Sequence, residues 1–217
     1  MPSVTETMHP GEFLISEAAG NRSREKVTVL SGQNLKAGHV LGAVLTALTV
    51  AAPVFAGTGN GAITMDATTP VLASAKVGAY TATCVTAATN GGTFRVEDPD
   101  GFVLGDVAVG ATFADDIKFV IADGSTDFVV GDKFTITVTA GSSKVRELNL
   151  TGIDGSEKAY GVLWDAIDAS AADVAGAAIV RDAEVDANDL TWPSGITTNQ
   201  KNAAIAQLAT RGIIVRS

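Results

Sequence analysis

The sequence predicts a mainly β protein with one short C-terminal helix (α+β), in which an antiparallel β-sandwich-like insert interrupts a small mixed fold. Three observations support this fold class. The chain has 23 Gly among 217 residues and few aromatic residues, which favours short strands joined by turns. Apolar and polar residues alternate in runs spaced about ten residues apart, with Gly and Asp between them. Only the segment after Thr197 has both the start and the stop signals of a helix.

The first 21 residues are predicted to form a flexible N-terminal arm. They mix Pro, Gly, Ser, Thr and Glu around a single apolar patch at residues 12–16, which is too little to form a core. No basic cluster followed by an apolar run stands at the start of the sequence, so a secretory signal is not expected.

Two strands are predicted after this arm, at residues 26–30 and 40–44, with a turn at residues 31–34. The run from residue 40 to residue 56 carries no charge, yet it is shorter than the roughly twenty residues of a membrane helix and contains Gly42 and Pro53. A buried strand followed by a linker is therefore favoured, and no membrane partner is expected. Residues 22–56 are assigned to the first half of a split domain.

Residues 57–141 are predicted to form the inserted β-sandwich-like domain. Gly57 to Gly61 are interpreted as a flexible joint before it, and Gly141 closes it. Strands are expected at residues 78–87, 92–97, 105–109, 117–122 and 133–139. Because side chains alternate between the two faces of a strand, the following residues are expected to form its core: Phe94, Val96, Phe119, Ile121, Phe134, Ile136 and Val138.

Residues 142–217 are predicted to complete the split domain. Strands are expected at residues 144–150, at residues 159–168 and near residue 180. The pair Trp192-Pro193 cannot lie within a helix, and Trp192 is expected to pack as a wedge in a core or an interface. Thr197 and Gln200 have the spacing of a capping box, so a helix is predicted to begin there and to end at Gly212. Residues 213–215 then form a last strand.

The composition argues against several classes of function. The net charge is −9, so a nucleic-acid partner is not expected. Cys84 is the only cysteine, which excludes an intrachain disulfide and a thiolate metal cluster. The two His are far apart and no Gly-x-Ser-x-Gly motif is present, so no catalytic residue, metal site or cofactor is predicted and an enzyme is not expected. A glycosidase that uses two carboxylates is compatible with the sequence, although few aromatic residues are present to stack on sugars.

Five segments together carry a resemblance to a known family. Residues 10–17, 21–28, 35–42, 154–163 and 192–216, in this order, resemble the head decoration proteins of tailed bacteriophages, the lambda head decoration protein family. The resemblance covers residues 10–50 and 144–217. The segment between Gly57 and Gly141 departs from the compact members of the family.

The resemblance implies a small mixed fold, assembly as homotrimers on the outer surface of the expanded phage head, and stabilisation of that head against internal DNA pressure. The partners would be the major capsid protein and other copies of the chain, in a virion whose proteins are made in the bacterial cytoplasm. The arm would become ordered on the capsid protein. The expected capsid contacts are Pro10, Gly11, Glu12, Phe13, Leu14 and Ile15.

Two questions remain open at the level of sequence. Trp164, Trp192 and Pro193 are expected either in the trimer contact or in core packing. The insert favours an alternative function, that of a surface adhesin or a receptor- or glycan-binding β-module that contacts a host surface component. The capsid that is recognised, the assembly state before binding and the partner of the insert are not encoded in any motif.

Overall fold

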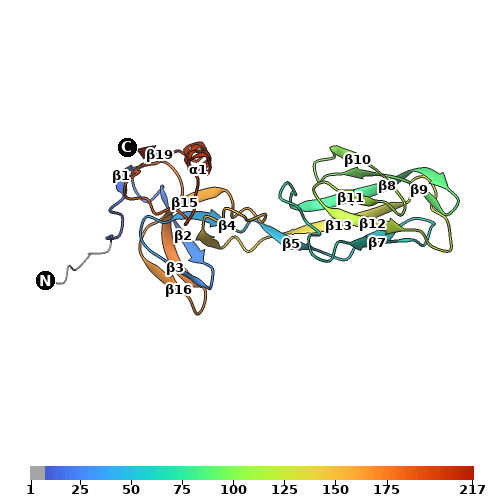
Figure 1. Ribbon diagram of the computed structural model, residues 1–217, viewed down its shortest axis with the longest axis horizontal. Helices are drawn as coiled ribbons and strands as arrows, with labels where there is room; N and C mark the ends of the chain where they lie inside the picture. The colour runs from blue at the N-terminus through green and yellow to red at the C-terminus, as the bar shows by residue number, and fades with distance from the viewer. Residues whose placement is uncertain (1–7) are drawn as a thin grey trace. The chain divides into compact units, whose positions relative to one another are not determined.

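The computed structural model describes residues 8–217, and Figure 1 shows the course of the chain. The protein is mainly β, and its described part contains one helix, close to the C-terminus, so the predicted fold class is confirmed. Two compact units are present. The host unit consists of residues 1–45 and 143–217, and the insert unit consists of residues 46–142.

The centre of the host unit is a closed barrel with the strand order β14-β2-β17-β15-β4. Its strands are β2 (Arg24–Val29), β4 (Val40–Ala43), β14 (Val145–Glu147), β15 (Ala159–Leu163) and β17 (Val174–Ile179). A two-stranded ladder pairs β3 (Gln33–Leu35) with β16 (Ile167–Ala169). The interior is filled by aliphatic side chains such as Val29, Leu41 and Ala178, a composition that fits the restricted space inside a small barrel.

A three-stranded sheet lies beside this barrel, with the order β1-β18-β19. The strands are β1 (Leu14–Glu17), β18 (Ala183–Asp186) and β19 (Ile213–Arg216), and helix α1 (Thr198–Thr210) precedes β19. Figure 1 shows β1, β19 and α1 on the same side of the host unit. The predicted capping box at Thr197 and Gln200 is present. Gly212 follows the helix with a φ of +78°, a conformation that favours glycine.

The insert unit consists of two antiparallel sheets that share one core. The larger sheet contains β10-β9-β8-β13-β5, and β6 also pairs with β13. Its strands are β5 (Thr46–Val50), β6 (Val54–Ala56), β8 (Gly78–Ala88), β9 (Gly91–Glu97), β10 (Val103–Ala108) and β13 (Lys133–Ala140). The smaller sheet contains β7 (Ala62–Met65), β11 (Thr112–Ala114) and β12 (Lys118–Ala122). All seven residues predicted for this core are buried in one cluster.

The insert begins earlier in the chain than expected, at Thr46 instead of Gly57. Strands β5 and β6 both pair with β13 of the insert, and Val50 and Phe55 pack against its core. The assignment of residues 46–56 to the split domain was therefore wrong. The structural boundary at Ser142 lies one residue from the predicted end of the insert at Gly141.

The two ends of the insert are adjacent in the host unit. The Val44 N–H donates to the Lys144 carbonyl oxygen (2.9 Å), and the Ser143 N–H donates to the Val44 carbonyl oxygen (2.8 Å). The host fold thus closes across the point of insertion, which explains how it accommodates a long extra segment.

Two buried polar groups hold the insert unit together. The Asp132 carboxylate, 3% exposed, accepts backbone N–H groups from Thr58 (2.9 Å), Gly59 (2.9 Å) and Val129 (3.1 Å). Burial opposes ionisation of this carboxyl, but the three donors outweigh it and hold the pKa of Asp132 below its ordinary value. The Tyr80 hydroxyl donates to Asp116 Oδ2 (3.0 Å), and burial raises the pKa of Tyr80 to about 12.

Gly57 to Gly61 do not form the flexible joint that was predicted. A Cβ atom added to Gly57 would lie 2.3 Å from Asp132 Oδ1, and one added to Gly61 would lie 2.2 Å from the Phe128 ring. These glycines are required because the backbone packs closely against the insert's own core.

Candidate functional site

The N-terminal segment that was predicted to contact the capsid is folded onto the host unit from residue 8 onward. Phe13 is fully buried in the core, and its ring meets the Trp164 ring edge to face at 6.2 Å. The Phe13 carbonyl oxygen accepts the Asp186 N–H at 2.8 Å. The prediction of a flexible arm over residues 1–21 was therefore wrong for the folded segment that contains Phe13, because Phe13 packs against residues far along the chain. Residues 1–7 lie outside the described residues.

Gly11 fixes the path of this segment over Trp164. Its φ of +71° favours glycine, and an added Cβ would lie 2.2 Å from Trp164 Cη2. The Gly11 N–H also donates to the Trp164 carbonyl oxygen at 2.9 Å. Gly11 and Phe13 are thus packing residues, and neither presents a side chain to a partner.

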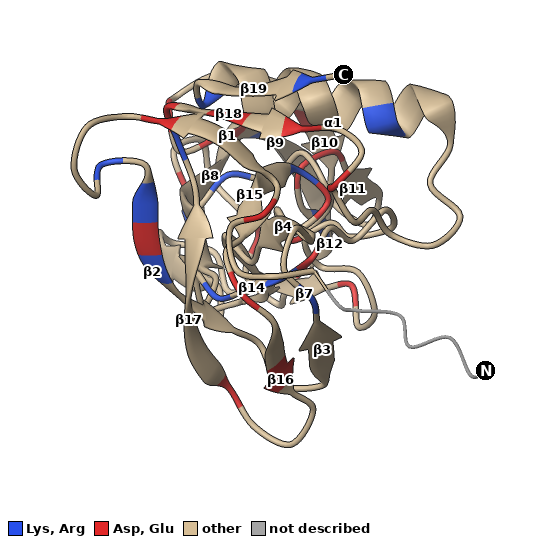
Figure 2. Cartoon of the chain, turned by 90° about the vertical axis from the view of Figure 1, so that its left-hand side faces the viewer, with Lys and Arg blue, Asp and Glu red and all other residues tan. Residues whose placement is uncertain are grey.

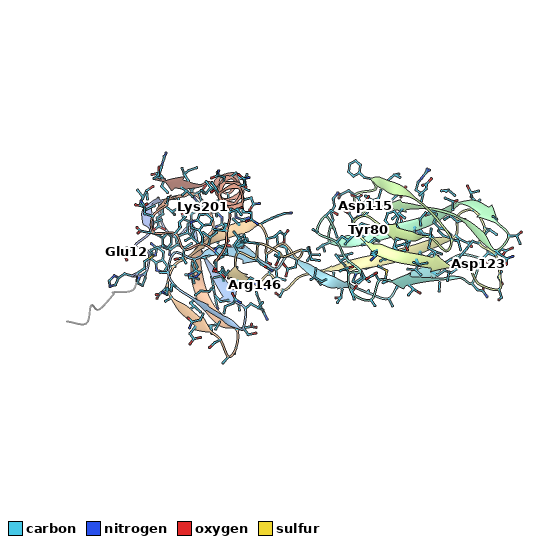
Figure 3. The ribbon with its side chains drawn as sticks, in the orientation of Figure 1. Glu12, Tyr80, Asp115, Asp123, Arg146 and Lys201 are labelled. Carbon is cyan, nitrogen blue, oxygen red and sulfur yellow. The ribbon has the colours of Figure 1, made fainter. Side chains whose placement is uncertain are left out.

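Pro10, Glu12 and Ile15 lie on the surface, and Leu14 is half-buried. Ile15 is 53% exposed and is one of the few large apolar side chains of the host unit that face solvent. The Glu12 carboxylate accepts the His9 N–H at 2.9 Å, and Figure 3 labels Glu12. Three of the six predicted contact residues are therefore clearly accessible.

No strand of the described chain extends the three-stranded sheet of β1, β18 and β19 at either edge. β18 lies in the middle, so β1 and β19 both have a free edge. Ile15 and Ile214 are exposed here, at 53% and 38%. We call the β1–β18–β19 face, with its two edges, the edge sheet.

One ion pair lies across the edge sheet. Arg216 pairs with the Glu184 carboxylate, which also accepts the Ser16 hydroxyl at 3.0 Å, and Arg216 holds the pKa of Glu184 below its ordinary value. Figure 2 shows acidic and basic residues interspersed around β18 and β19. The accessible features are thus apolar side chains and unpaired backbone groups, which suit strand addition by a partner.

Trp164 is half-buried and packs against the core of the host unit, and its predicted trimer role stays a prediction. One side of its ring meets Phe13, and the Arg24 guanidinium carbon lies 3.7 Å from the ring centroid. Arg24 in turn pairs with Glu17 of β1 at 2.6 Å, and this hydrogen bond raises the pKa of Arg24 and lowers that of Glu17. Trp164 thereby connects the barrel to the N-terminal segment.

Trp192 and Pro193 lie beside the same core. Pro193 is buried and Trp192 is half-buried, and the Lys201 ammonium lies 5.1 Å from the Trp192 ring centroid. The indole N–H of Trp192 is buried without a hydrogen-bond partner among residues 8–217. The predicted trimer role of these residues stays a prediction.

Within the described residues, no group of three or more His, Cys, Asp or Glu could hold a metal ion. Cys84 is 1% exposed in the insert core, and burial raises the pKa of its thiol. No helix in residues 8–217 combines the length and apolarity needed to cross a bilayer.

The fold and this surface define a mainly β protein of two units, with β1 and β19 as the edge strands of a three-stranded sheet in the host unit. The family model of bacteriophage lambda head decoration protein D matches residues 3–213, a range that includes the insert unit. The chain belongs to this family. It is accordingly a structural protein of the bacteriophage head that decorates the capsid surface. Neither a search of curated proteins nor a search of solved structures gives a significant match.

Proposed function

We propose that this protein cements the expanded phage head as a homotrimer, binds the major capsid protein on the outer surface of the virion, and stabilises the shell against internal DNA pressure. Family membership over residues 3–213 is the observation that carries the proposal. The role is structural and non-catalytic, with synthesis in the bacterial cytoplasm before assembly. Strength in such a shell comes from repetition, because many individually modest contacts act together.

The edge sheet supports a specific mode of attachment to the capsid. β1 is already paired with β18 on one side, so an extended segment of the capsid protein would add to its free edge. Backbone hydrogen bonds would supply affinity, and pockets for side chains such as Ile15 would supply specificity.

The test compares two exposed apolar residues. Ile15→Asp puts a charge on the edge sheet, whereas Val130→Asp, at a site 66% exposed in the insert unit, makes a matched change elsewhere. Co-sedimentation with expanded capsids should show at least about tenfold weaker binding for Ile15→Asp, corresponding to about 1.4 kcal/mol, and native binding for Val130→Asp. Native binding by both variants would contradict attachment through β1.

A second candidate function belongs to the insert unit, as a binding module for a host surface component. Seven of the ten exposed large apolar residues in the described chain lie there, among them Phe102 at 67%, and contiguous exposed apolar groups often mark binding surfaces. Because Val44 and Ser143 are hydrogen-bonded, residues 46–142 can be replaced by a short Gly-Ser linker. Capsid binding should survive this deletion, and binding to host cells, measured with decorated capsids, should disappear.

A further inference from the structure

A second surface of the host unit contains an arginine whose Nε atom has no hydrogen-bond partner among residues 8–217. A groove of about 320 Å³ is lined by Arg146, Glu147, Leu148, Asn149, Leu150, Thr151, Pro193 and Ser194. Leu148 and Pro193 are buried and form its apolar floor. Figure 3 labels Arg146, which comes from β14 of the barrel.

The Arg146 Nε atom is buried and has no hydrogen-bond partner in the described chain, and no ion pair of its guanidinium is found among these residues. The adjacent acid, Glu147, does not neutralise it. Glu147 also lines the groove, but its carboxylate lies 3.7 Å from His39 Nε2, and no ion pair with Arg146 is found in the described chain. A buried donor without an acceptor is unfavourable, so the groove is incomplete in a single copy.

The missing group is an acceptor with negative charge. A guanidinium presents a planar fork of donors that matches a carboxylate, and arginine is the cation most often used where an ion pair is buried in an interface. The apolar floor would exclude water around such a pair, which strengthens it.

The chain itself supplies suitable carboxylates on a different surface. Asp165 is exposed in the connection between β15 and β16, and Asp168 is exposed within β16. Their described hydrogen bonds come from their local surroundings: the Ala166 N–H donates to Asp165 and the Ser170 N–H donates to Asp168. No cation of residues 8–217 pairs with either carboxylate.

A ring of identical copies requires two different, complementary patches on each copy. We propose that the Arg146 groove of one copy receives residues 165–168 of the next copy, the connection after β15 and the start of β16, with Asp165 as the carboxylate that binds the guanidinium. This inference rests on the homotrimer of the proposed function and assigns its contact.

The test is a charge-reversal cycle in the full chain. The variants are Arg146→Glu, Asp165→Arg and the double variant, and Lys26→Glu is the control because Lys26 is exposed on β2 of the same unit. Chemical cross-linking followed by mass analysis measures oligomers, first in solution over a concentration series and then on expanded capsids. Every variant should keep a cooperative melting transition as a free chain, since no ion pair of either side chain is found among residues 8–217.

Each single reversal should reduce the yield of cross-linked trimers at least tenfold, the control should match the native chain, and the double variant should restore trimers. Native yields from Arg146→Glu, or a double variant that restores nothing, would overturn the pairing. A loss of capsid binding with native cross-linking would assign the groove to the capsid protein and would also overturn it. If the native chain does not pellet with capsids, the proposed function is refuted. The Arg146–Asp165 pairing is then still measured by cross-linking in solution, and the absence of oligomers there overturns the pairing.

Discussion

Replacing Phe13 by alanine distinguishes a folded N-terminal segment from a free arm. The Phe13 side chain is fully buried and contacts Trp164. Removing a buried phenylalanine costs about 3–5 kcal/mol, and the lost aromatic pair places the expected value above the lower end of that range. The host unit of the Phe13→Ala variant should therefore lose about 4 kcal/mol of unfolding free energy.

The assay can be restricted to the host unit, because both tryptophans of the chain, Trp164 and Trp192, belong to it. Their fluorescence during urea unfolding reports this unit alone. With a denaturant slope of about 2 kcal/mol per molar urea, the midpoint should fall by about 2 M. Ile15→Ala, at an exposed position of β1, should change the free energy by less than about 0.5 kcal/mol. A midpoint shift below about 0.5 M for Phe13→Ala would refute the packing argument.

Three further substitutions test the interior of the two units. Asp132→Asn should lower the melting temperature of the insert unit in calorimetry. The pKa of Asp132 is depressed in the fold, so its contribution is present above about pH 4 and is lost as the pH falls; an unchanged acid profile in the variant would contradict this role. Tyr80→Phe leaves Asp116 without its hydroxyl donor and should cost about 1–3 kcal/mol, whereas a neutral effect by calorimetry would show that water replaces the bond. In Gly42→Ala the new Cβ would lie 2.0 Å from the Ser156 carbonyl oxygen, so the host unit should fail to fold, and a native tryptophan spectrum would disprove the close packing.

The parts of the fold that depend on local pattern could be predicted from the sequence. The helix after Thr197 follows from a capping box formed within three residues. The insert core follows from alternation along single strands, which places Phe94 and Phe134 on the buried faces. In both cases the relevant contacts are fixed by the period of the element.

The boundary of the insert could not be predicted, because it depends on pairing between distant strands. The uncharged run from residue 40 to residue 56 changes units after Leu45 without any change of composition. Only its hydrogen bonds to β13 reveal that Thr46 and the residues after it belong to the insert. The glycines at 57–61 were misinterpreted for a related reason, since close packing and flexibility select the same residue.

The candidate surface was predicted only in part, because the edge sheet unites segments from both ends of the chain. Ser16 and Glu184, which are hydrogen-bonded across β1 and β18, are 168 residues apart. The sequence pointed to residues 10–15, yet nothing local distinguishes the exposed Ile15 from the buried Phe13. The Arg146 Nε atom, which has no partner among residues 8–217, has no sequence signal, since its lack of an acceptor is a property of the folded groove.

The folded N-terminal segment changes the energetics expected for capsid binding. An arm that becomes ordered on the capsid would lose its own conformational freedom during binding, and this loss would reduce the affinity. β1 has already lost that freedom through pairing with β18 and packing of Phe13. When a capsid segment adds to this preformed edge, only the capsid segment would lose conformational entropy. Deleting residues 1–21 would consequently remove part of the host core together with the proposed contact, so the exposed Ile15 is the position at which binding and folding can be tested separately.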